Sequence, residues 1–175
     1  YVYGAWCVKP EDLKDAIGGM RALGISGINV TAPHKVEVMK YIDVVTDGAK
    51  KLGSVNTVVN RDGKLYGYNT DADGFCMALT KAGIEIENSR ILIIGAGGVV
   101  RPTLIRLIDN KPKSITVVNR TKSKAKTLAE DILKSTGFEV KTEINKLEFD
   151  IVINTTSAGM EPQENVMPIN EAAQA

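Results

Sequence analysis

Polar side chains that can act on a substrate gather at three places in the first half of the chain, between apolar segments. The three clusters are residues 29–35, 54–57 and 69–71. Loops at strand ends are where α/β proteins collect their ligand-binding groups. Thr, Asn, Lys and Asp together offer donors and acceptors suited to a polyhydroxylated carboxylate. Lys35 and Asp71 would form an ionisable pair able to relay a proton from a substrate hydroxyl.

Each of these residues also has a simpler interpretation when it is taken singly. Lys35 is then one of many solvated lysines, Asp71 caps a helix, and Asn56 satisfies backbone groups in a turn. His34 is the only histidine. Without a nearby nucleophile or metal cluster, we expect it to build a turn rather than to catalyse.

A glycine-rich turn in the second half predicts a nucleotide site. Gly95-Ala96-Gly97-Gly98 follows the apolar run 91–94 and precedes an apolar helix. Missing Cβ atoms let a pyrophosphate approach the backbone, and a helix N-terminus offers N–H groups and partial positive charge. Val100 stands at the third small position of the dinucleotide fingerprint, which predicts a helix slightly further from the strand. The alternative is a tight turn that binds nothing.

The end of the next strand favours NADP over NAD. NAD sites usually carry an acidic residue about 20 residues after the glycines, to bind the ribose hydroxyl. Here the chain instead carries Asn119-Arg120-Thr121, followed by Lys122 and Lys124. Arg120 can bind a 2′-phosphate with its planar fork of donors, and Thr121 adds a hydroxyl. The alternative is a capping threonine beside a solvated basic turn. Arg101 is expected to face either solvent or phosphate.

The first half reads as β-α-β-α-β-β. Residues 1–8, with Tyr1, Tyr3 and Trp6, are rich in aromatic and β-branched types and predict a buried strand. The later elements are a helix from Pro10 to about residue 23, a strand over 25–30, a short helix with Pro33 near its start, and strands over 54–60 and 64–68. Asp62-Gly63 between the last two strands predicts a β-hairpin.

The second half reads as a parallel α/β unit. Its predicted elements are a helix from residue 71 to about 82, strands over 91–94, 115–118, 138–144 and 151–153, an apolar helix after the glycines and a helix over 122–134. Strands that alternate with helices predict parallel pairing. We place the domain boundary near residues 70–84, with a first domain over 1–72 and a second over 73–175.

Composition excludes several classes of partner. The 175 residues carry 22 Lys+Arg against 21 Asp+Glu, which leaves no broad basic field for nucleic acid. No apolar run approaches the roughly 18–20 residues that span a bilayer, and no signal peptide is visible. Cys7 and Cys76 lack the partners of a metal or redox motif. We therefore expect a cytoplasmic protein that binds no metal, nucleic acid or membrane.

Six motifs in order give the chain a family resemblance. It resembles the shikimate dehydrogenases through NVTAPHK (29–35), SVNTVVN (54–60), GYNTDADG (67–74), GAGG (95–98), NRT (119–121) and NTTSAGM (154–160). The resemblance implies an N-terminal α/β substrate domain followed by a Rossmann-like NADP-binding domain, with the active site in the cleft between them. It implies reduction of 3-dehydroshikimate to shikimate by NADPH, in aromatic amino-acid biosynthesis.

The resemblance also implies residue roles. Lys35 matches the catalytic lysine that exchanges the proton of the C3 hydroxyl, and Asp71 matches its acidic partner; both also contact the substrate. Thr31 and Asn56 match further substrate-binding positions. The cofactor positions are Gly95, Ala96, Gly97, Gly98, Val99, Asn119, Arg120, Thr121, Lys124, Thr155, Thr156 and Ser157. The expected partner is shikimate or 3-dehydroshikimate, and a homodimer is left open.

Three alternatives stay open at this point. A quinate/shikimate dehydrogenase using NAD or NADP shares the motifs, although Arg120-Thr121 favours NADP and the shikimate branch. A non-catalytic NADP-binding regulatory protein shares the scaffold, although it would not need Lys35 and Asp71. The third is a shortened chain that folds without turnover. The family's opening strand with its Ser-x-Ser segment and its C-terminal helices are not matched, so both domains are expected to be incomplete.

Overall fold

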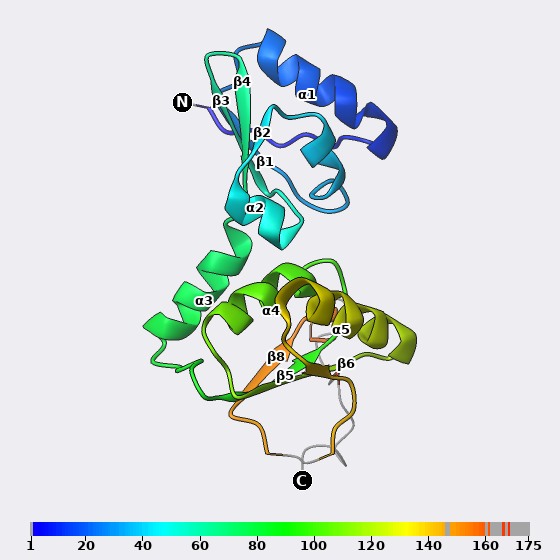
Figure 1. Cartoon of the computed structure of the whole chain (residues 1–175). Helices are drawn as coiled ribbons and strands as arrows, with labels where there is room; N and C mark the ends of the chain where they lie inside the picture. Colours follow the sequence, from blue (N-terminus) through cyan, green and yellow to red (C-terminus); the bar gives the residue numbers. More distant parts are fainter. Residues whose placement is uncertain (1, 146–147, 160, 162–165, 167, 169–175) are drawn as a thin grey trace. The chain divides into compact units, whose positions relative to one another are not determined.

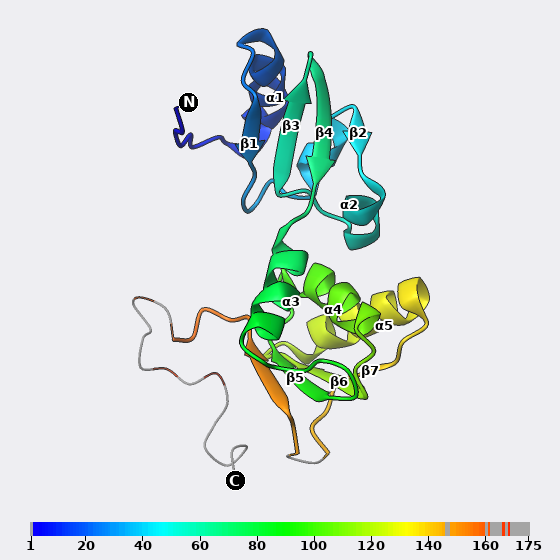
Figure 2. The same cartoon turned by 90° about the vertical axis from the view of Figure 1, so that its left-hand side faces the viewer.

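The chain folds into two units in a computed structural model. The structure describes residues 2–145, 148–159, 161, 166 and 168. Backbone packing divides the chain into Tyr1–Asp73 and Gly74–Ala175, and each unit has its own sheet (Figures 1 and 2). Within the described residues, every helix is too short or too polar to cross a membrane.

The first unit is built on a mixed four-stranded sheet in the order β1-β3-β4-β2. β3 pairs antiparallel with both β1 and β4, while β2 runs parallel to β4. Its elements are the 3-10 helix η1 (Pro10–Asp12), α1 (Leu13–Ala22), β1 (Gly27–Asn29), the 3-10 helix η2 (Glu37–Lys40), β2 (Val44–Val45), α2 (Asp47–Leu52), β3 (Thr57–Arg61) and β4 (Lys64–Tyr68).

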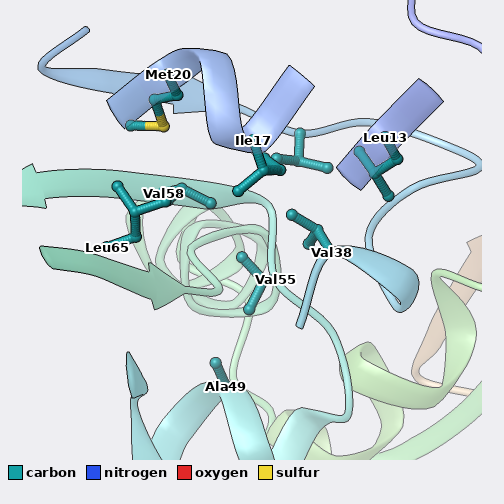
Figure 3. Packing of buried hydrophobic residues seen from close by; sticks show 9 residues of the cluster. Leu13, Ile17, Met20, Val38, Ala49, Val55, Val58 and Leu65 are labelled. Atoms are coloured by element: carbon teal, nitrogen blue, oxygen red, sulfur yellow. The ribbon is translucent and has the colours of Figure 1, made fainter. Parts of the chain in front are cut away.

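The apolar stripe of α1 forms the centre of this unit's core. Leu13, Ile17 and Met20 recur at helical spacing and are all buried. Figure 3 shows them facing side chains from the hairpin and the neighbouring turns, among them Val58 and Leu65. Burying each such side chain stabilises the unit by about 1.5–3 kcal/mol before entropy is counted.

The predicted hairpin is confirmed. β3 and β4 pair antiparallel from Thr57 opposite Tyr68 to Arg61 opposite Lys64. Asp62 and Gly63 connect them with φ values of 53° and 83°, as the favoured two-residue hairpin turn requires. Asn60 accepts a hydrogen bond from the Gly63 N–H at 2.8 Å and so closes the turn.

The predicted strand over residues 1–8 is wrong for the residues that the structure describes. Residues 2–8 pair with no strand, and Tyr3 and Trp6 are 83% and 69% exposed rather than buried; Tyr1 lies outside the described residues. β-propensity expresses fit to a sheet surface, so a segment without a neighbouring ladder does not become a strand. The helix expected from Pro33 is also wrong, because the chain turns over 32–36 after a cis Ala32–Pro33 bond and η2 begins at Glu37.

The second unit has the predicted parallel sheet, in the order β7-β6-β5-β8. α4 and α5 lie side by side on one of its faces (Figures 1 and 2). The elements are α3 (Asp71–Lys81), which begins in the first unit, β5 (Arg90–Ile94), α4 (Val100–Asp109), β6 (Ser114–Val118), α5 (Lys122–Thr136), β7 (Val140–Lys141) and β8 (Ile151–Asn154). Of the strand expected over 138–144, only β7 forms, and its two residues pair with β6.

A charged cluster joins the first residue of β5 to the residue before β8. Arg90 donates to both carboxylate oxygens of Asp150 at 3.0 and 2.9 Å and to Glu148 at 2.6 Å. The Arg90 backbone N–H also donates to Asp150 at 2.7 Å. The Arg90 side chain and this backbone N–H lower the pKa of Asp150 to about 2.

We predict that Asp150 contributes to the acid stability of the second unit. Its pKa in the folded chain lies below the usual value, so its contribution is complete at neutral pH and is lost as the pH falls from about 4 to about 2. Asp150→Asn should lower the melting temperature at pH 7 and flatten its fall over this acidic range, measured by circular dichroism. An acid dependence equal to that of the wild type would contradict this assignment.

Candidate functional site

Three polar residues from different segments of the first unit meet in the structure. Lys35 Nζ donates to Asp71 Oδ2 at 2.5 Å, and Asn56 Nδ2 donates to Asp71 Oδ1 at 2.6 Å. The Asp71 carboxylate is therefore held on both oxygens, one by a cation and one by an amide. The predicted pairing of Lys35 and Asp71 is present, although the two residues lie 36 positions apart in the sequence.

Local structure places each of the three side chains. Lys35 stands in the turn before η2, and its carbonyl accepts a hydrogen bond from the Val55 N–H at 2.8 Å. Asn56 immediately precedes β3, and Asp71 is the first residue of α3. The site thus combines a residue in a turn, the residue before a strand and the first residue of a helix, as expected for α/β proteins.

Asn56 is buried, with 6% of its surface exposed, and its side chain is saturated with partners. Its Oδ1 accepts hydrogen bonds from the Thr70 N–H and the Thr57 hydroxyl, both at 3.0 Å. Its Nδ2 also lies 3.0 Å from Thr70 Oγ1. Sequence reasoning missed this role of Thr70, although the residue lies inside the GYNTDADG motif beside Asp71.

Thr31 and His34 belong to the turn that precedes Lys35. Thr31 is exposed, and its carbonyl accepts the His34 N–H at 2.9 Å. Its neighbour Val30 donates its N–H to the Asn56 carbonyl at 2.7 Å, which keeps this turn beside the cluster. His34 Nε2 lies 2.9 Å from the Val8 carbonyl oxygen, so its ring contacts the N-terminal segment.

The cluster is suited to proton exchange with a bound hydroxyl or carbonyl oxygen. The Lys35 and Asp71 side chains are 24% and 50% exposed, so solvent and a small molecule can reach the ion pair. An ammonium group held at a fixed place can donate a proton to an oxygen within hydrogen-bonding distance and take it back in the reverse direction. The carboxylate keeps the ammonium in place.

Gly95 lies at a backbone junction in the second unit. Its N–H donates to the Val118 carbonyl at 2.8 Å, while the Thr155 N–H donates to the Ile94 carbonyl at 2.9 Å. These bonds join the carboxyl ends of three neighbouring parallel strands. Gly95 has a φ of +115°, and a Cβ there would collide with Thr155 Oγ1. Only glycine fits this position without strain.

The glycines that follow are open. A Cβ built on Gly97 or Gly98 would meet no atom within 4 Å, so the backbone is accessible to a ligand at both positions. Ala96 is partly buried and Val99 is exposed. Val100, at the position where a small residue is usual, is fully buried at the start of α4.

The basic segment after β6 is exposed. Asn119 Nδ2 donates to the Thr121 carbonyl at 3.0 Å, and Thr121 is the N-cap residue before α5 and makes no side-chain capping bond. Arg120, Thr121 and Lys124 are all exposed. Arg101 instead forms an ion pair with Asp131 of α5 at 2.6 Å, which neither sequence interpretation foresaw.

The threonines after β8 are engaged in local structure. Thr155 Oγ1 donates to the Ile94 carbonyl at 2.8 Å, and Thr156 Oγ1 donates to Asn154 Oδ1 at 2.8 Å. The Ala158 N–H donates to Thr156 Oγ1 at 3.1 Å. Ser157 is exposed. Thr155 and Thr156 thus shape the wall of the glycine turn, and Ser157 is the one whose side chain faces solvent.

Comparison with known proteins gives a consistent picture. Residues 1–58 match the model of the shikimate dehydrogenase substrate binding domain, and residues 77–171 match that of the shikimate / quinate 5-dehydrogenase family. The chain is 49% identical over 175 residues to a shikimate dehydrogenase (NADP(+)) of Geobacillus sp. strain WCH70.

Solved structures agree with these matches. A shikimate dehydrogenase in complex with NADP+ superposes with a TM-score of 0.89 at 39% identity, over 99% of this chain and 62% of that one. A shikimate 5-dehydrogenase of Listeria monocytogenes, in complex with shikimate and NAD, gives a TM-score of 0.87 at 34% identity, over 100% of this chain and 65% of that one. The Geobacillus alignment covers 97% of this chain and 63% of the relative. The chain therefore spans less than two thirds of the proteins it matches.

The glycine turn yields a prediction with a built-in control. Gly95→Ala should destabilise the second unit by about 2 kcal/mol or more, because the new Cβ collides with Thr155 and the backbone angle is strained. Gly97→Ala should leave the melting temperature unchanged, since its Cβ enters open space. Denaturant unfolding of both variants checks this, and equal losses would contradict the structural difference between the two glycines.

Proposed function

Because the chain belongs to the shikimate / quinate 5-dehydrogenase family, we propose that it carries out NADP-dependent interconversion of 3-dehydroshikimate and shikimate. The observation that carries this proposal is the contact of Lys35 with Asp71, itself held by Asn56. A lysine ammonium fixed by a carboxylate is the group that an alcohol–ketone conversion needs at its oxygen. The site residues given by the sequence motifs and the geometry of the first unit support the same reaction.

In this proposal Lys35 is the general acid in one direction and the general base in the other. In the direction of reduction its ammonium donates a proton to the carbonyl oxygen at C3, and in the direction of oxidation its amine takes that proton from the hydroxyl. Asp71 orients Lys35 through the 2.5 Å contact and leaves part of its own carboxylate exposed for substrate hydroxyls. Thr31 offers an exposed hydroxyl beside the same cluster. Asn56 serves mainly by orienting Asp71, since most of its side chain is buried.

The residues of the second unit fit NADP, which when bound would supply the hydride for this conversion. The open backbone at Gly97 and Gly98 suits a pyrophosphate, with Gly95, Ala96 and Val99 completing the turn. The exposed Arg120, with Thr121, Lys124 and Asn119, suits the 2′-phosphate and its ribose. Thr155 and Thr156 shape the adjacent wall, and Ser157 is exposed beside it.

One assay tests the proposal against its alternatives. Cofactor reduction by the purified chain is followed at the absorbance of the reduced nicotinamide, with shikimate or quinate and with NADP or NAD in all four pairings. Turnover with shikimate and NADP alone supports the proposal. Turnover with quinate supports a quinate/shikimate enzyme, and silence in all four with intact NADP binding supports a binding role. The cytoplasmic location and a homodimer stay predictions.

We predict that Lys35→Ala lowers turnover by about 100-fold or more, the usual size of a lost general acid–base group. NADP affinity measured by calorimetry should not change, because the glycine turn and the basic segment belong to the other unit. Lys40→Ala is the matched control, since Lys40 forms an ion pair with Glu37 in the same unit outside the cluster. Equal loss of turnover and NADP binding in Lys35→Ala would remove the proposed role.

We predict that Arg120→Ala weakens NADP binding by about tenfold or more and leaves NAD binding nearly unchanged, because the guanidinium serves only the 2′-phosphate. Lys134→Ala is the control. It removes an exposed positive charge from the last turn of α5, the helix that follows Arg120, and should change the affinity for neither cofactor. Calorimetric titrations of both cofactors check the difference. Equal weakening of NADP and NAD by Arg120→Ala would contradict 2′-phosphate recognition.

A further inference from the structure

Two buried polar side chains lie behind the Lys35–Asp71 contact and belong to none of the roles above. Ser54 and Asn69 are only 5% and 8% exposed. Asn69 Nδ2 donates to the Ser54 carbonyl at 3.1 Å and lies 2.8 Å from Ser54 Oγ. Asn69 Oδ1 accepts the Asp71 N–H at 3.1 Å. Both ends of this buried amide are therefore bonded, one to the segment before β3 and the other to the first residue of α3.

The segment 54–56 also determines where Lys35 lies. The Val55 N–H donates to the Lys35 carbonyl at 2.8 Å, and Asn56 holds the Asp71 carboxylate and the Thr70 N–H. Val55 thus bonds the backbone of Lys35 and Asn56 bonds the carboxylate of Asp71, whereas Ser54 reaches the Asp71 N–H only through Asn69. Lys35 and Asp71 stay in contact because both are hydrogen-bonded, directly or through Asn69, to the same short segment.

The tie through Asn69 has a distinct physical consequence. The Asp71 side chain is half exposed, so water competes for its carboxylate and the ion pair alone fixes it weakly. The Ser54–Asn69 bonds are shielded from water, and losing one partner leaves a buried polar group unsatisfied. The buried pair therefore resists displacement of the start of α3 more strongly than the exposed pair does.

We propose that Asn69 is a positioning residue, which holds Asp71 against Lys35 by bonding Ser54 on one side and the Asp71 N–H on the other. Its side chain is buried, so the role proposed for it acts through Asp71. The effect of Asn69 on proton transfer rests on the proposed function, whereas its effect on the contact between Lys35 and Asp71 does not.

The test reads the ion pair directly, without substrate. Acetic anhydride labels free amines, and mass spectrometry gives the labelling rate of Lys35 across a pH series in the folded chain. Asp71→Asn provides the rate of a Lys35 without its carboxylate. Asn69→Ala removes both ties. Asn60→Ala is the matched control, because Asn60 accepts the Gly63 N–H in the hairpin turn of the same unit, away from the cluster.

We expect Asn69→Ala to raise the labelling rate of Lys35 about threefold, toward that of Asp71→Asn, the size expected for a partly exposed ion pair. Asn60→Ala should leave the rate unchanged. A wild-type rate in folded Asn69→Ala, or an equal rise in Asn60→Ala, would overturn the proposal.

A second variant separates positioning from simple turn formation. Asn69→Ser keeps a hydroxyl that can accept the Asp71 N–H but has no amide to reach Ser54. Lys35 should be labelled in Asn69→Ser at the same rate as in Asn69→Ala. A wild-type rate would mean that Asn69 only forms the turn before α3. If Asn69→Ala does not fold, Ser54→Ala removes the Oγ partner alone and should still raise the rate. No rise there overturns the proposal.

Turnover distinguishes this inference from the proposed function. If the wild-type chain oxidises shikimate, Asn69→Ala should lower kcat about tenfold through misplacement of the proton donor, with NADP affinity unchanged. An unchanged kcat would overturn the positioning role. If the wild-type chain turns over no substrate, the proposed function fails, while the labelling of Lys35 still decides whether Asn69 holds Asp71.

Discussion

A buried amide must satisfy its donor and its acceptor inside the protein, and in the first unit this requirement falls on Asn56. Its oxygen accepts from Thr70 and Thr57, and its nitrogen donates to Asp71. Leaving one of these buried groups without a hydrogen-bond partner would cost about 1–3 kcal/mol of stability. The start of α3 therefore has a defined place beside β3, and the Asp71 carboxylate has a defined direction. Lys35 meets that carboxylate because the Val55 N–H holds its carbonyl.

The second unit depends on a steric constraint rather than on a polar one. Parallel strands end at the same edge, and the carboxyl ends of β5, β6 and β8 come together at Gly95. No side chain fits there, because Thr155 occupies the space that a Cβ would need. The exposed backbone at Gly97 and Gly98 follows directly. One unit thus holds a lysine and a carboxylate in fixed contact, and the other leaves the backbone of a glycine turn open.

Periodic and turn signals in the sequence were reliable where they act locally. Of the apolar stripe expected on the helix from Pro10 (Leu13, Ala16, Ile17, Met20 and Leu23), Leu13, Ile17 and Met20 became the buried face of α1, whereas Ala16 and Leu23 are exposed. Asp62-Gly63 adopted the backbone angles of a two-residue hairpin. The described part of the segment, residues 2–8, forms no strand. Strand formation needs a neighbouring strand, and composition carries no information about whether one is present. Residues 138–144 contributed only Val140 and Lys141 to the sheet, although β6 extends to Val118 beside them.

The sequence by itself determined the family, the alternation of strands and helices in the second unit and the residues that can do chemistry, because side-chain type and spacing are local properties. Lys35, Asp71, Gly95 and Arg120 could all be named from it. The pairing of Lys35 with Asp71 was also predicted, but only the tertiary structure decided what holds the two side chains. The burial of Asn56 and Asn69, the tie of both to α3, and the pairing of Arg101 with Asp131 depend on contacts between residues far apart in the chain. Such contacts arise from packing, which no local pattern encodes.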